Sequence, residues 1–222
     1  MRKEPLVTGE CYHIYNRGVD KRDIFDSIED VERFKESIKQ FNQVEAIGSL
    51  EMHNKSVRAL DSHSKMFKTE PLISIVAFCV NPNHFHFILK QVVDGGISKF
   101  MQKILGGYTY FFNQKYQRSG SLLQGTFKSK LISDENYFRK IFSYVNQNYQ
   151  VHDIPKNKMY LVFASDKEYE NEVFDFVSKT EAEEVLEMFD NKKDFNKHCA
   201  EIIAIICEER GKLSLSEPDE LP

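Results

Sequence analysis

The chain of 222 residues contains no tryptophan, only 4 cysteines and no long hydrophobic run. The cysteines are scattered and none lies in a Cys-x-x-Cys pair, which favours a reducing compartment and argues against a thiolate metal site. No apolar stretch approaches the roughly 20 residues that a membrane-spanning helix needs. The opening segment, MRKEPLVTGE, does not resemble a signal peptide. We therefore expect a cytoplasmic protein that does not bind membranes.

Aromatic and charged residues are plentiful, by contrast. The chain has 18 Phe and 10 Tyr, and 41% of its residues are hydrophobic, which is enough for a folded core. The net charge of −4 is unevenly distributed: residues 1–155 hold 21 Lys and Arg against 17 Asp and Glu, and residues 156–222 hold 9 against 17. This shift predicts a main domain over 1–155 and an acidic, mainly helical C-terminal extension over 156–222.

The order of apolar patterns predicts an α+β fold, with an antiparallel sheet covered by helices. Strands are expected at 11–18, 72–80 and 84–90, with the last two forming a hairpin around Asn-Pro-Asn. Helices are expected at 27–44, 97–117 and 134–150, and a glycine turn leading into a β-like segment at 120–132. Residues 52–71 are expected to form a long loop. The extension is expected to contain helices at 180–189 and 194–212 and a frayed tail at 213–222.

Two histidines stand one residue apart in the predicted return strand. Successive side chains of a strand point to opposite faces, so His84 and His86 share one face, while Phe85, Phe87 and Leu89 share the other. The phenylalanine face is expected to be buried, and the other face presents two neighbouring imidazoles. Such a pair is a candidate metal site, although a histidine pair on a half-exposed strand without any metal is the alternative.

The last helix of the main domain carries a second candidate pair. Tyr144 and Asn148 are four residues apart, and helical spacing places them on neighbouring turns beside the apolar stripe. If this helix packs beside His84 and His86, two imidazoles and an amide oxygen could hold Mn²⁺, Mg²⁺ or Zn²⁺. The tyrosine hydroxyl could then attack a phosphodiester. Tyr137 lies on the same side of the helix and is a competing candidate.

Together these segments resemble the one-tyrosine transposases of the histidine–hydrophobic–histidine endonuclease superfamily, in particular the REP-associated tyrosine transposases. The segments that carry the resemblance are GECYHIYNRGVDKRDIF, NPNHFHFIL, YTYFFNQKYQRSGSLLQGTFKSKLI and DENYFRKIFSYVNQN. They occur in the family's order and cover roughly residues 9–155. The resemblance implies that residues 1–155 form a catalytic domain with a ferredoxin-like or RRM-like core.

The resemblance also implies roles for individual residues. His84, His86 and Asn148 would be ligands of a divalent metal, Mg²⁺ or Mn²⁺, and Tyr144 the nucleophile. The pairing of Tyr144 with Asn148 favours it over Tyr137, which has an apolar residue four positions later. The implied partner is single-stranded DNA, often hairpin-forming, cleaved through a 5′-phosphotyrosine link. The protein would act as a monomer or homodimer and be associated with the nucleoid when bound to DNA.

Basic residues outside this constellation are candidates for DNA contacts, with a solvated charge as the alternative for each. The candidates are Arg17, Lys99, Lys103, Lys128, Lys130, Arg139 and Lys140.

Two positions depart from the family pattern: Thr126 stands where the glycine turn usually meets an arginine, and Tyr149 where a proline usually follows the ligand asparagine. Two alternative functions therefore stay open. One is a DNA-binding protein that keeps the fold without turnover, and the other is an RNA-binding α+β module.

Overall fold

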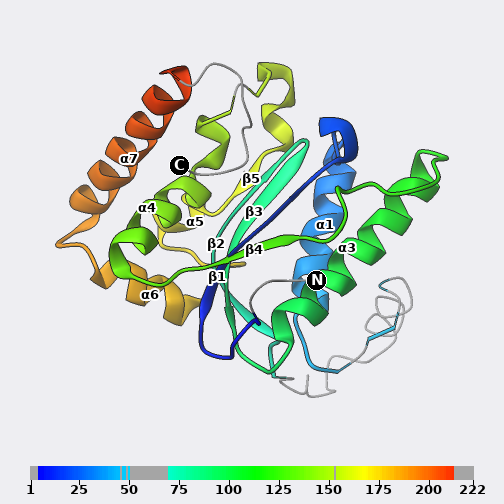
Figure 1. Cartoon of the computed structure of the whole chain (residues 1–222), viewed down its shortest axis with the longest axis horizontal. Helices are drawn as coiled ribbons and strands as arrows, with labels where there is room; N and C mark the ends of the chain where they lie inside the picture. The colour runs from blue at the N-terminus through cyan, green and yellow to red at the C-terminus, as the bar shows by residue number, and fades with distance from the viewer. Residues whose placement is uncertain (1–4, 46, 49, 51–69, 153, 213–222) are drawn as a thin grey trace.

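A five-stranded antiparallel sheet in the order β4-β1-β3-β2-β5 forms the centre of the molecule (Figure 1). The computed structural model describes residues 5–45, 47, 48, 50, 70–152 and 154–212. The strands are β1 (Cys11–Arg17), β2 (Ile73–Asn81), β3 (His84–Gln91), β4 (Lys128–Leu131) and β5 (Phe163–Ala164). The expected α+β class with an antiparallel sheet is confirmed, because the elements up to β4 follow the β-α-β-β-α-β order of ferredoxin-like proteins.

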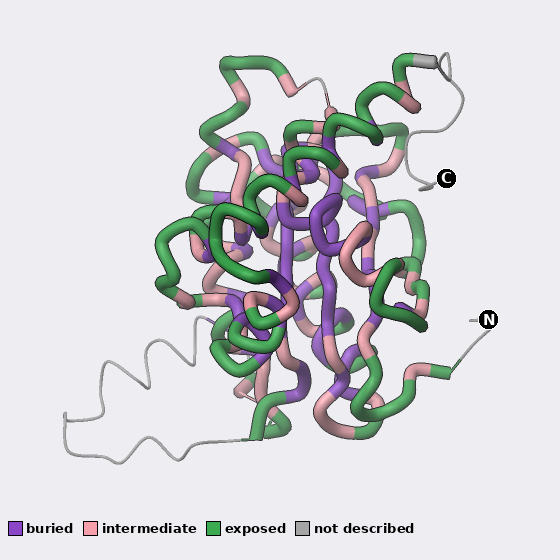
Figure 2. Tube along the Cα trace, turned by 90° about the vertical axis from the view of Figure 1, so that its left-hand side faces the viewer, coloured by how far each residue is buried: buried purple, intermediate pink, exposed green. Residues whose placement is uncertain are grey.

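Helices form a layer on each side of this sheet (Figure 1). On one side lie α1 (Ile28–Phe41) and α3 (Gly96–Lys115), and on the other α4 (Glu135–Asn146), α6 (Lys179–Glu187) and α7 (Lys192–Lys212). The shorter elements are η1 (Val19–Lys21), η2 (Asn148–Gln150), η3 (Lys156–Leu161) and α5 (Asp166–Asn171). Figure 2 shows the buried residues concentrated in the strands between the two layers. Within the described residues, no helix is both long enough and apolar enough to cross a membrane.

The side of β3 that faces α1 and α3 is apolar. Phe85, Phe87 and Leu89 point to this side, here called the apolar face, and each is 0% exposed. The ring of Phe85 lies 6.0 Å from that of Phe34 in α1, so the sheet and helix share one core. Full burial of a side chain of this size contributes roughly 1.5–3 kcal/mol. The alternation in the sequence therefore predicts this half of the fold correctly.

The opposite side of β3 is also covered. His84 and His86 are only 3% and 1% exposed, because α4 and η2 lie over β2 and β3. The strand register places His13 and Tyr15 of β1, and Asn81 of β2, on the same side as these two histidines. We call this side the histidine face. Its histidines and Asn81 are buried nearly as deeply as the phenylalanines behind them, so their polar atoms must find partners within the protein.

Two features of the C-terminal half differ from the sequence-based expectations. The predicted helix over 134–150 ends at Asn146, and Asn148 follows in the short turn η2. An additional strand, β5, pairs with β2 at the edge of the sheet, and its length of 2 residues is too short for any alternation to reveal it. The two predicted helices of the extension are confirmed as α6 and α7. The expected loop over 52–71 falls largely, and the tail over 213–222 wholly, outside the described residues.

Residues beyond 155 pack into the same hydrophobic core as the sheet. The extension contributes Leu161, Tyr169, Val177, Ala182, Val185, Phe189, Phe195, Cys199 and Ile206 to that core. Ser165 accepts a hydrogen bond from the backbone N–H of Phe78 in β2 at 2.9 Å. The division into two domains at residue 155 stays a prediction, and the structure adds that the extension completes one edge of the sheet.

Candidate metal centre and nucleophile

The end of β2, the start of β3 and η2 bring three polar side chains together. Nε2 of His84 lies 3.0 Å from Oδ1 of Asn148. The other ring nitrogen, Nδ1, lies 2.5 Å from Oδ1 of Asn83, an acceptor, so Nδ1 carries the proton and Nε2 presents its lone pair to Asn148. A metal-ligating histidine is oriented in this way by an acceptor on its second nitrogen. Two of the three predicted ligands therefore meet.

A buried amide lies between these two lone pairs. Nδ2 of Asn81 donates to Nε2 of His84 at 2.9 Å and to Oδ1 of Asn148 at 2.7 Å. Asn81 is 0% exposed. Two acceptors that converge on one donor can equally converge on a cation, so His84 and Asn148 fit a divalent metal that takes the place of the amide hydrogens. Asn81 is absent from the sequence-based expectations, although its position just before the turn places it opposite His84.

The third predicted ligand, His86, is held by a neighbouring histidine. Its Nδ1 lies 2.8 Å from Nε2 of His13 on β1. Burial, followed by the charge of Lys130, lowers the pKa of His13 to about 3. Burial and then the neighbouring His13 hold the pKa of His86 well below its usual value. Both rings are therefore neutral near pH 7, which is the form that binds metals. When Nδ1 of His86 donates the hydrogen bond to Nε2 of His13, Nε2 of His86 carries a lone pair that can bind a metal.

Tyr144 lies on the histidine face. Its ring meets the ring of His86 edge-on, with centroids 5.4 Å apart at 80°, and that of His13 at 6.3 Å and 89°. The side chain is only 1% exposed. It is therefore buried more deeply than expected for a residue beside the apolar stripe of the helix. The competing Tyr137 lies near the start of α4, where Nζ of Lys130 is 4.8 Å from its ring centroid. Of the two, Tyr144 is the one whose ring contacts the histidines.

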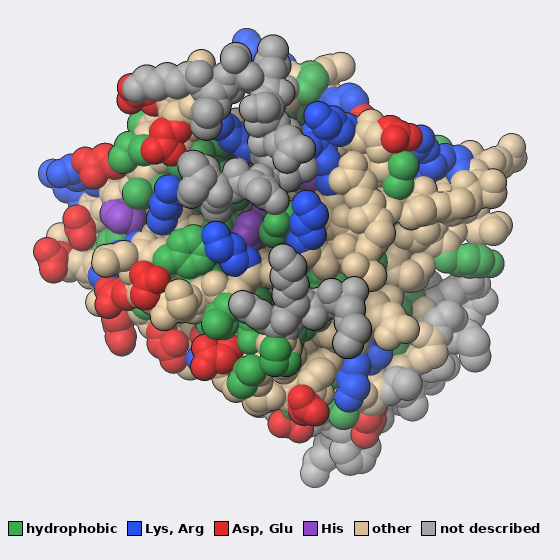
Figure 3. All heavy atoms as spheres, viewed as in Figure 1, with side chains coloured by type: hydrophobic (Ala, Val, Ile, Leu, Met, Phe, Trp, Pro, Cys, Tyr) green, Lys and Arg blue, Asp and Glu red, His purple; other side chains and the backbone are tan. Residues whose placement is uncertain are grey.

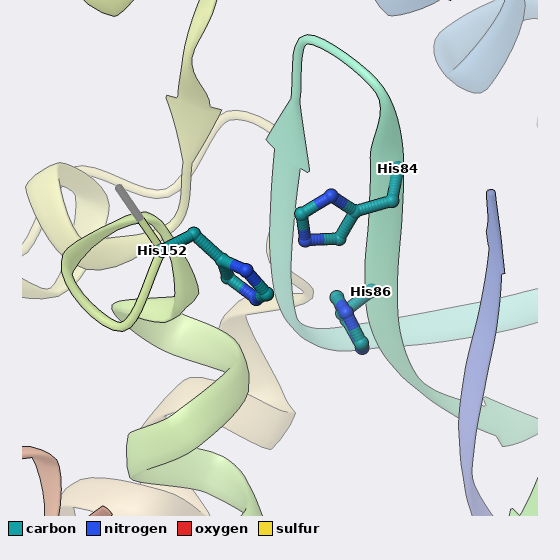
Figure 4. A group of neighbouring side chains, drawn as sticks. All are labelled: His84, His86 and His152. Atoms are coloured by element: carbon teal, nitrogen blue, oxygen red, sulfur yellow. The ribbon is translucent and has the colours of Figure 1, made fainter. Parts of the chain in front are cut away.

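A third histidine joins the predicted pair. One ring nitrogen each of His84, His86 and His152 lies within 4.8 Å of the others (Figure 4). The ring centroids of His84 and His152 are 4.4 Å apart. Burial, and then the charges of His84 and Arg210, lower the pKa of His152 to about 2, so this ring is neutral as well. The sequence gives no periodic signal for His152, because it follows the end of α4 in an irregular segment.

Three of the predicted DNA-contacting residues lie on the histidine face. Arg17 and Lys128 line a small depression together with His84 and His86. The register of β4 against β1 places Lys130 opposite His13, on the same side as Lys128. Figure 3 shows Lys and Arg side chains next to exposed histidine atoms on the side of the molecule toward the viewer. This part of the surface combines positive charge with the candidate metal ligands.

Three of the four remaining predicted DNA contacts are not brought to this surface. Lys99 and Lys103 lie on α3, on the opposite side of the sheet, and Lys103 donates to the backbone oxygen of Gln43 at 3.0 Å. Arg139 is on α4, but it pairs with Glu135 at 2.8 Å and its guanidinium lies over Phe189, away from the histidines. Lys140 also lies on α4 and is partly buried.

The central strand of the sheet, β3, carries His84-Phe85-His86, and the helix that carries Tyr144 packs over it. A family model described as "Transposase IS200 like" matches residues 52–148, a range that includes His84, His86 and Tyr144 and ends at Asn148. The expected resemblance to the one-tyrosine transposases is thus confirmed.

One solved structure, described as a REP-associated tyrosine transposase bound to a REP hairpin, has a similar fold. It aligns with a TM-score of 0.50 and 14% sequence identity, over 80% of this chain and 90% of that one. At this identity the likeness concerns the fold. No curated protein sequence matches the chain.

Proposed function

We propose that the protein is a metal-dependent transposase or nickase of single-stranded DNA, with Tyr144 as its nucleophile. The observation that carries the proposal is the 3.0 Å approach of His84 Nε2 to Asn148 Oδ1, with Tyr144 packed against His86 on the same face of the sheet. The match of the IS200-like transposase family to residues 52–148 supports it, since all four residues fall within that range.

The proposed chemistry is a transfer of a phosphodiester to Tyr144. The hydroxyl oxygen of Tyr144 forms a bond to phosphorus while the bond from phosphorus to the 3′ oxygen breaks. The tyrosine loses its proton, and the 3′ oxygen leaves as a hydroxyl after gaining one. The product is a 5′-phosphotyrosine, so a free 3′-hydroxyl can reverse the reaction without a nucleotide cofactor.

His84, His86 and Asn148 would hold the metal ion for this reaction. A divalent ion at that place supplies a Lewis acid for a phosphate oxygen and a template for the phosphodiester. The chain's own contribution is the orientation of the ligands: Asn83 fixes the tautomer of His84, and His13 fixes the ring of His86. Such outer partners influence metal affinity strongly.

The histidine face also suits an unpaired strand. Lys128 and Lys130 on β4 and Arg17 on β1 can meet phosphates, and the ring of Tyr15 lies among them, 5.7 Å from Nζ of Lys128. Positive charge next to an aromatic ring is how proteins bind single strands without reading a duplex. The similar transposase structure contains a REP hairpin, and we propose hairpin-associated single strands as the substrate class here as well.

The buried state of Tyr144 sets a condition on this mechanism. With 1% of its side chain exposed, its hydroxyl meets a phosphodiester only after the groups around α4 move apart. DNA binding and the exposure of Tyr144 are therefore coupled in this proposal. A DNA-binding protein without turnover would keep Tyr144 covered when DNA is bound.

A covalent-adduct assay tests the proposal. The full chain is incubated with Mn²⁺ or Mg²⁺ and a labelled library of single-stranded hairpin DNA, and denaturing gels report protein–DNA adducts. We expect adducts with the wild type, none above background with Tyr144→Phe, and wild-type levels with the matched variant Tyr137→Phe. Adducts that persist in Tyr144→Phe would show that another residue is the nucleophile. Binding of the library without any adduct would support the binding-only alternative.

A further inference from the structure

His152 lies against the proposed metal ligands without belonging to the motif that identifies them. Its ring centroid is 4.4 Å from that of His84, and the ring nitrogens of His84, His86 and His152 converge to within 4.8 Å (Figure 4). Ligands at about 2.1 Å from one ion are separated by about 3 to 4 Å, so small side-chain shifts bring all three nitrogens into range. Asn148 Oδ1 already lies 3.0 Å from one of them.

The backbone holds His152 in this place. Asn148 and His152 are four residues apart, and the backbone N–H of Val151 donates to the oxygen of Asn148 at 3.0 Å, which closes the turn between them. Nη1 of Arg210 in α7 is 3.3 Å from the oxygen of Val151, which ties this turn to the outer helix. One short turn thus places both Asn148 and His152 at the start of β3, next to His84.

The ring of His152 has no strong hydrogen bond of its own. Its Nε2 is buried and has no hydrogen-bond partner. Its Nδ1 lies 3.4 Å from Nη1 of Arg210, the same nitrogen that approaches Val151, so this contact is long and shared. A buried imidazole nitrogen without a partner costs stability unless something else, such as a cation, binds there.

We infer that His152 is a fourth ligand of the metal centre, and that a site of three imidazoles and one amide oxygen prefers Mn²⁺, Co²⁺ or Zn²⁺ to Mg²⁺. This inference depends on the proposed function in one respect: both place a divalent cation at His84, His86 and Asn148. Imidazole nitrogen suits transition-metal ions, whereas Mg²⁺ favours oxygen ligands and retains its water. The third imidazole therefore shifts the selectivity of the site away from Mg²⁺.

Metal titrations of the full chain without DNA test this inference. Calorimetry gives the affinities for Mn²⁺ and Mg²⁺, and the visible absorption of added Co²⁺ reports the nitrogen ligands directly. We expect the wild type to bind Mn²⁺ at least about tenfold more tightly than Mg²⁺. His152→Ala is expected to weaken Mn²⁺ binding by about tenfold or more, since even loss of an outer partner costs about 10–100-fold, and to change the Co²⁺ spectrum.

His198 offers a matched control. Its Nε2 is also buried without a hydrogen-bond partner, but it lies in α7 beside Phe189, 5.4 Å between ring centroids, and not among the metal ligands. His198→Ala should leave Mn²⁺ affinity and the Co²⁺ spectrum unchanged. His152→Gln, which keeps a polar side chain, guards against misfolding of the alanine variant and should also lose the wild-type Co²⁺ spectrum.

Three results would overturn the inference: equal Mn²⁺ affinity in the wild type and both His152 variants, a wild-type preference for Mg²⁺, or no metal binding by the wild type. The outcome is separate from that of the proposed function. If metal binding depends on His152 but Tyr144 forms no adduct, only the proposed function fails. If Tyr144-dependent adducts form while His152→Ala binds Mn²⁺ normally, only the role of His152 fails.

Discussion

The two faces of β3 are buried to nearly the same degree and are stabilised in different ways. Phe85 and Phe87 on the apolar face are 0% exposed, and His84 and His86 on the histidine face are 3% and 1% exposed. On the apolar face, rings pack against helices without any need for directed partners. On the histidine face, each buried nitrogen needs a hydrogen bond or an ion.

That need is met incompletely. Nδ2 of Asn148 and Nε2 of His152 are buried without hydrogen-bond partners, both within the candidate metal centre. An unsatisfied buried polar group costs about 1–3 kcal/mol, and folded proteins keep few of them. The difference between the faces teaches that burial alone does not distinguish a core from a site. The site is distinguished by two acceptors, Nε2 of His84 and Oδ1 of Asn148, that converge on the amide of Asn81.

The largest expected effect is a loss of stability on the apolar face. Phe87→Ala removes a fully buried ring and leaves a cavity, so we expect the free energy of unfolding to fall by about 3–5 kcal/mol in urea denaturation. The fraction of Phe87→Ala that remains folded should bind Mn²⁺ about as tightly as the wild type does. A loss below about 1 kcal/mol would show that the apolar face is not the main source of stability.

On the histidine face, we expect a large loss of metal affinity and a smaller loss of stability. Asn148→Ala removes the oxygen that lies 3.0 Å from His84, so we expect Mn²⁺ affinity to fall by about tenfold or more, or about 1.4 kcal/mol and above. Stability without metal should change by less than in Phe87→Ala, because Asn81 keeps its bond to His84. Calorimetric titration and urea unfolding of the same sample measure both quantities. If stability falls without any change in metal affinity, Asn148 is a structural residue.

The next largest effect is expected on stability, from the buried carboxylate of Asp30 in α1, the helix that packs on the apolar face. Burial alone would raise the pKa of Asp30 in α1, but hydrogen bonds from Lys115 at 2.8 Å and Tyr116 at 2.8 Å outweigh it and lower the pKa below its usual value. Because Lys115 is partly exposed, we expect Asp30→Asn to cost only about 1–2 kcal/mol at pH 7.

The pH dependence of that cost follows from the sign of the shift. A carboxylate with a lowered pKa in the folded state contributes its stability above its unfolded pKa of about 3.9, and this contribution disappears as the pH falls through the folded pKa. The stabilities of the wild type and Asp30→Asn should therefore begin to converge as the pH falls below about 4. A difference that stays constant from pH 7 to pH 2 would contradict the role given to Asp30. Thermal unfolding at a series of pH values measures it.

The smallest expected effect compares lysines on the two sides of the sheet. Lys128→Ala on the histidine face should weaken binding of single-stranded DNA a few-fold and reduce the salt dependence by about one charge. Lys99→Ala, an exposed lysine of α3 on the opposite side, should change neither quantity. Fluorescence anisotropy at several salt concentrations gives both values. Equal effects of the two substitutions would mean that DNA does not select the histidine face.

Much of the fold can be predicted from the sequence because its strands and helices are periodic. Alternation in β3 separates His84 from Phe85, and the strong helical stripe around Tyr144 places that residue on a helix near the sheet. The pairing of β1, β2 and β3 then follows from a hairpin and an antiparallel sheet. These elements contain most of the candidate site.

The rest depends on tertiary contacts that no local pattern reports. His152 follows the early end of α4, so a helical projection cannot place it, and Asn81 enters the site only through its register opposite His84. The side of the sheet on which Lys99 lies depends on the packing of α3, which charge alone does not determine. Sequence patterns thus identify ligands within regular elements and miss those in turns.

The central claim is that the histidine face contains a phosphodiester-transfer site whose nucleophile is Tyr144. The most direct measurement is peptide mass spectrometry of the purified protein–DNA adduct after digestion with nuclease and protease. The account predicts a nucleotide remnant attached to Tyr144 through its phosphate. Attachment to Tyr15, Tyr137 or Tyr149 instead would contradict it.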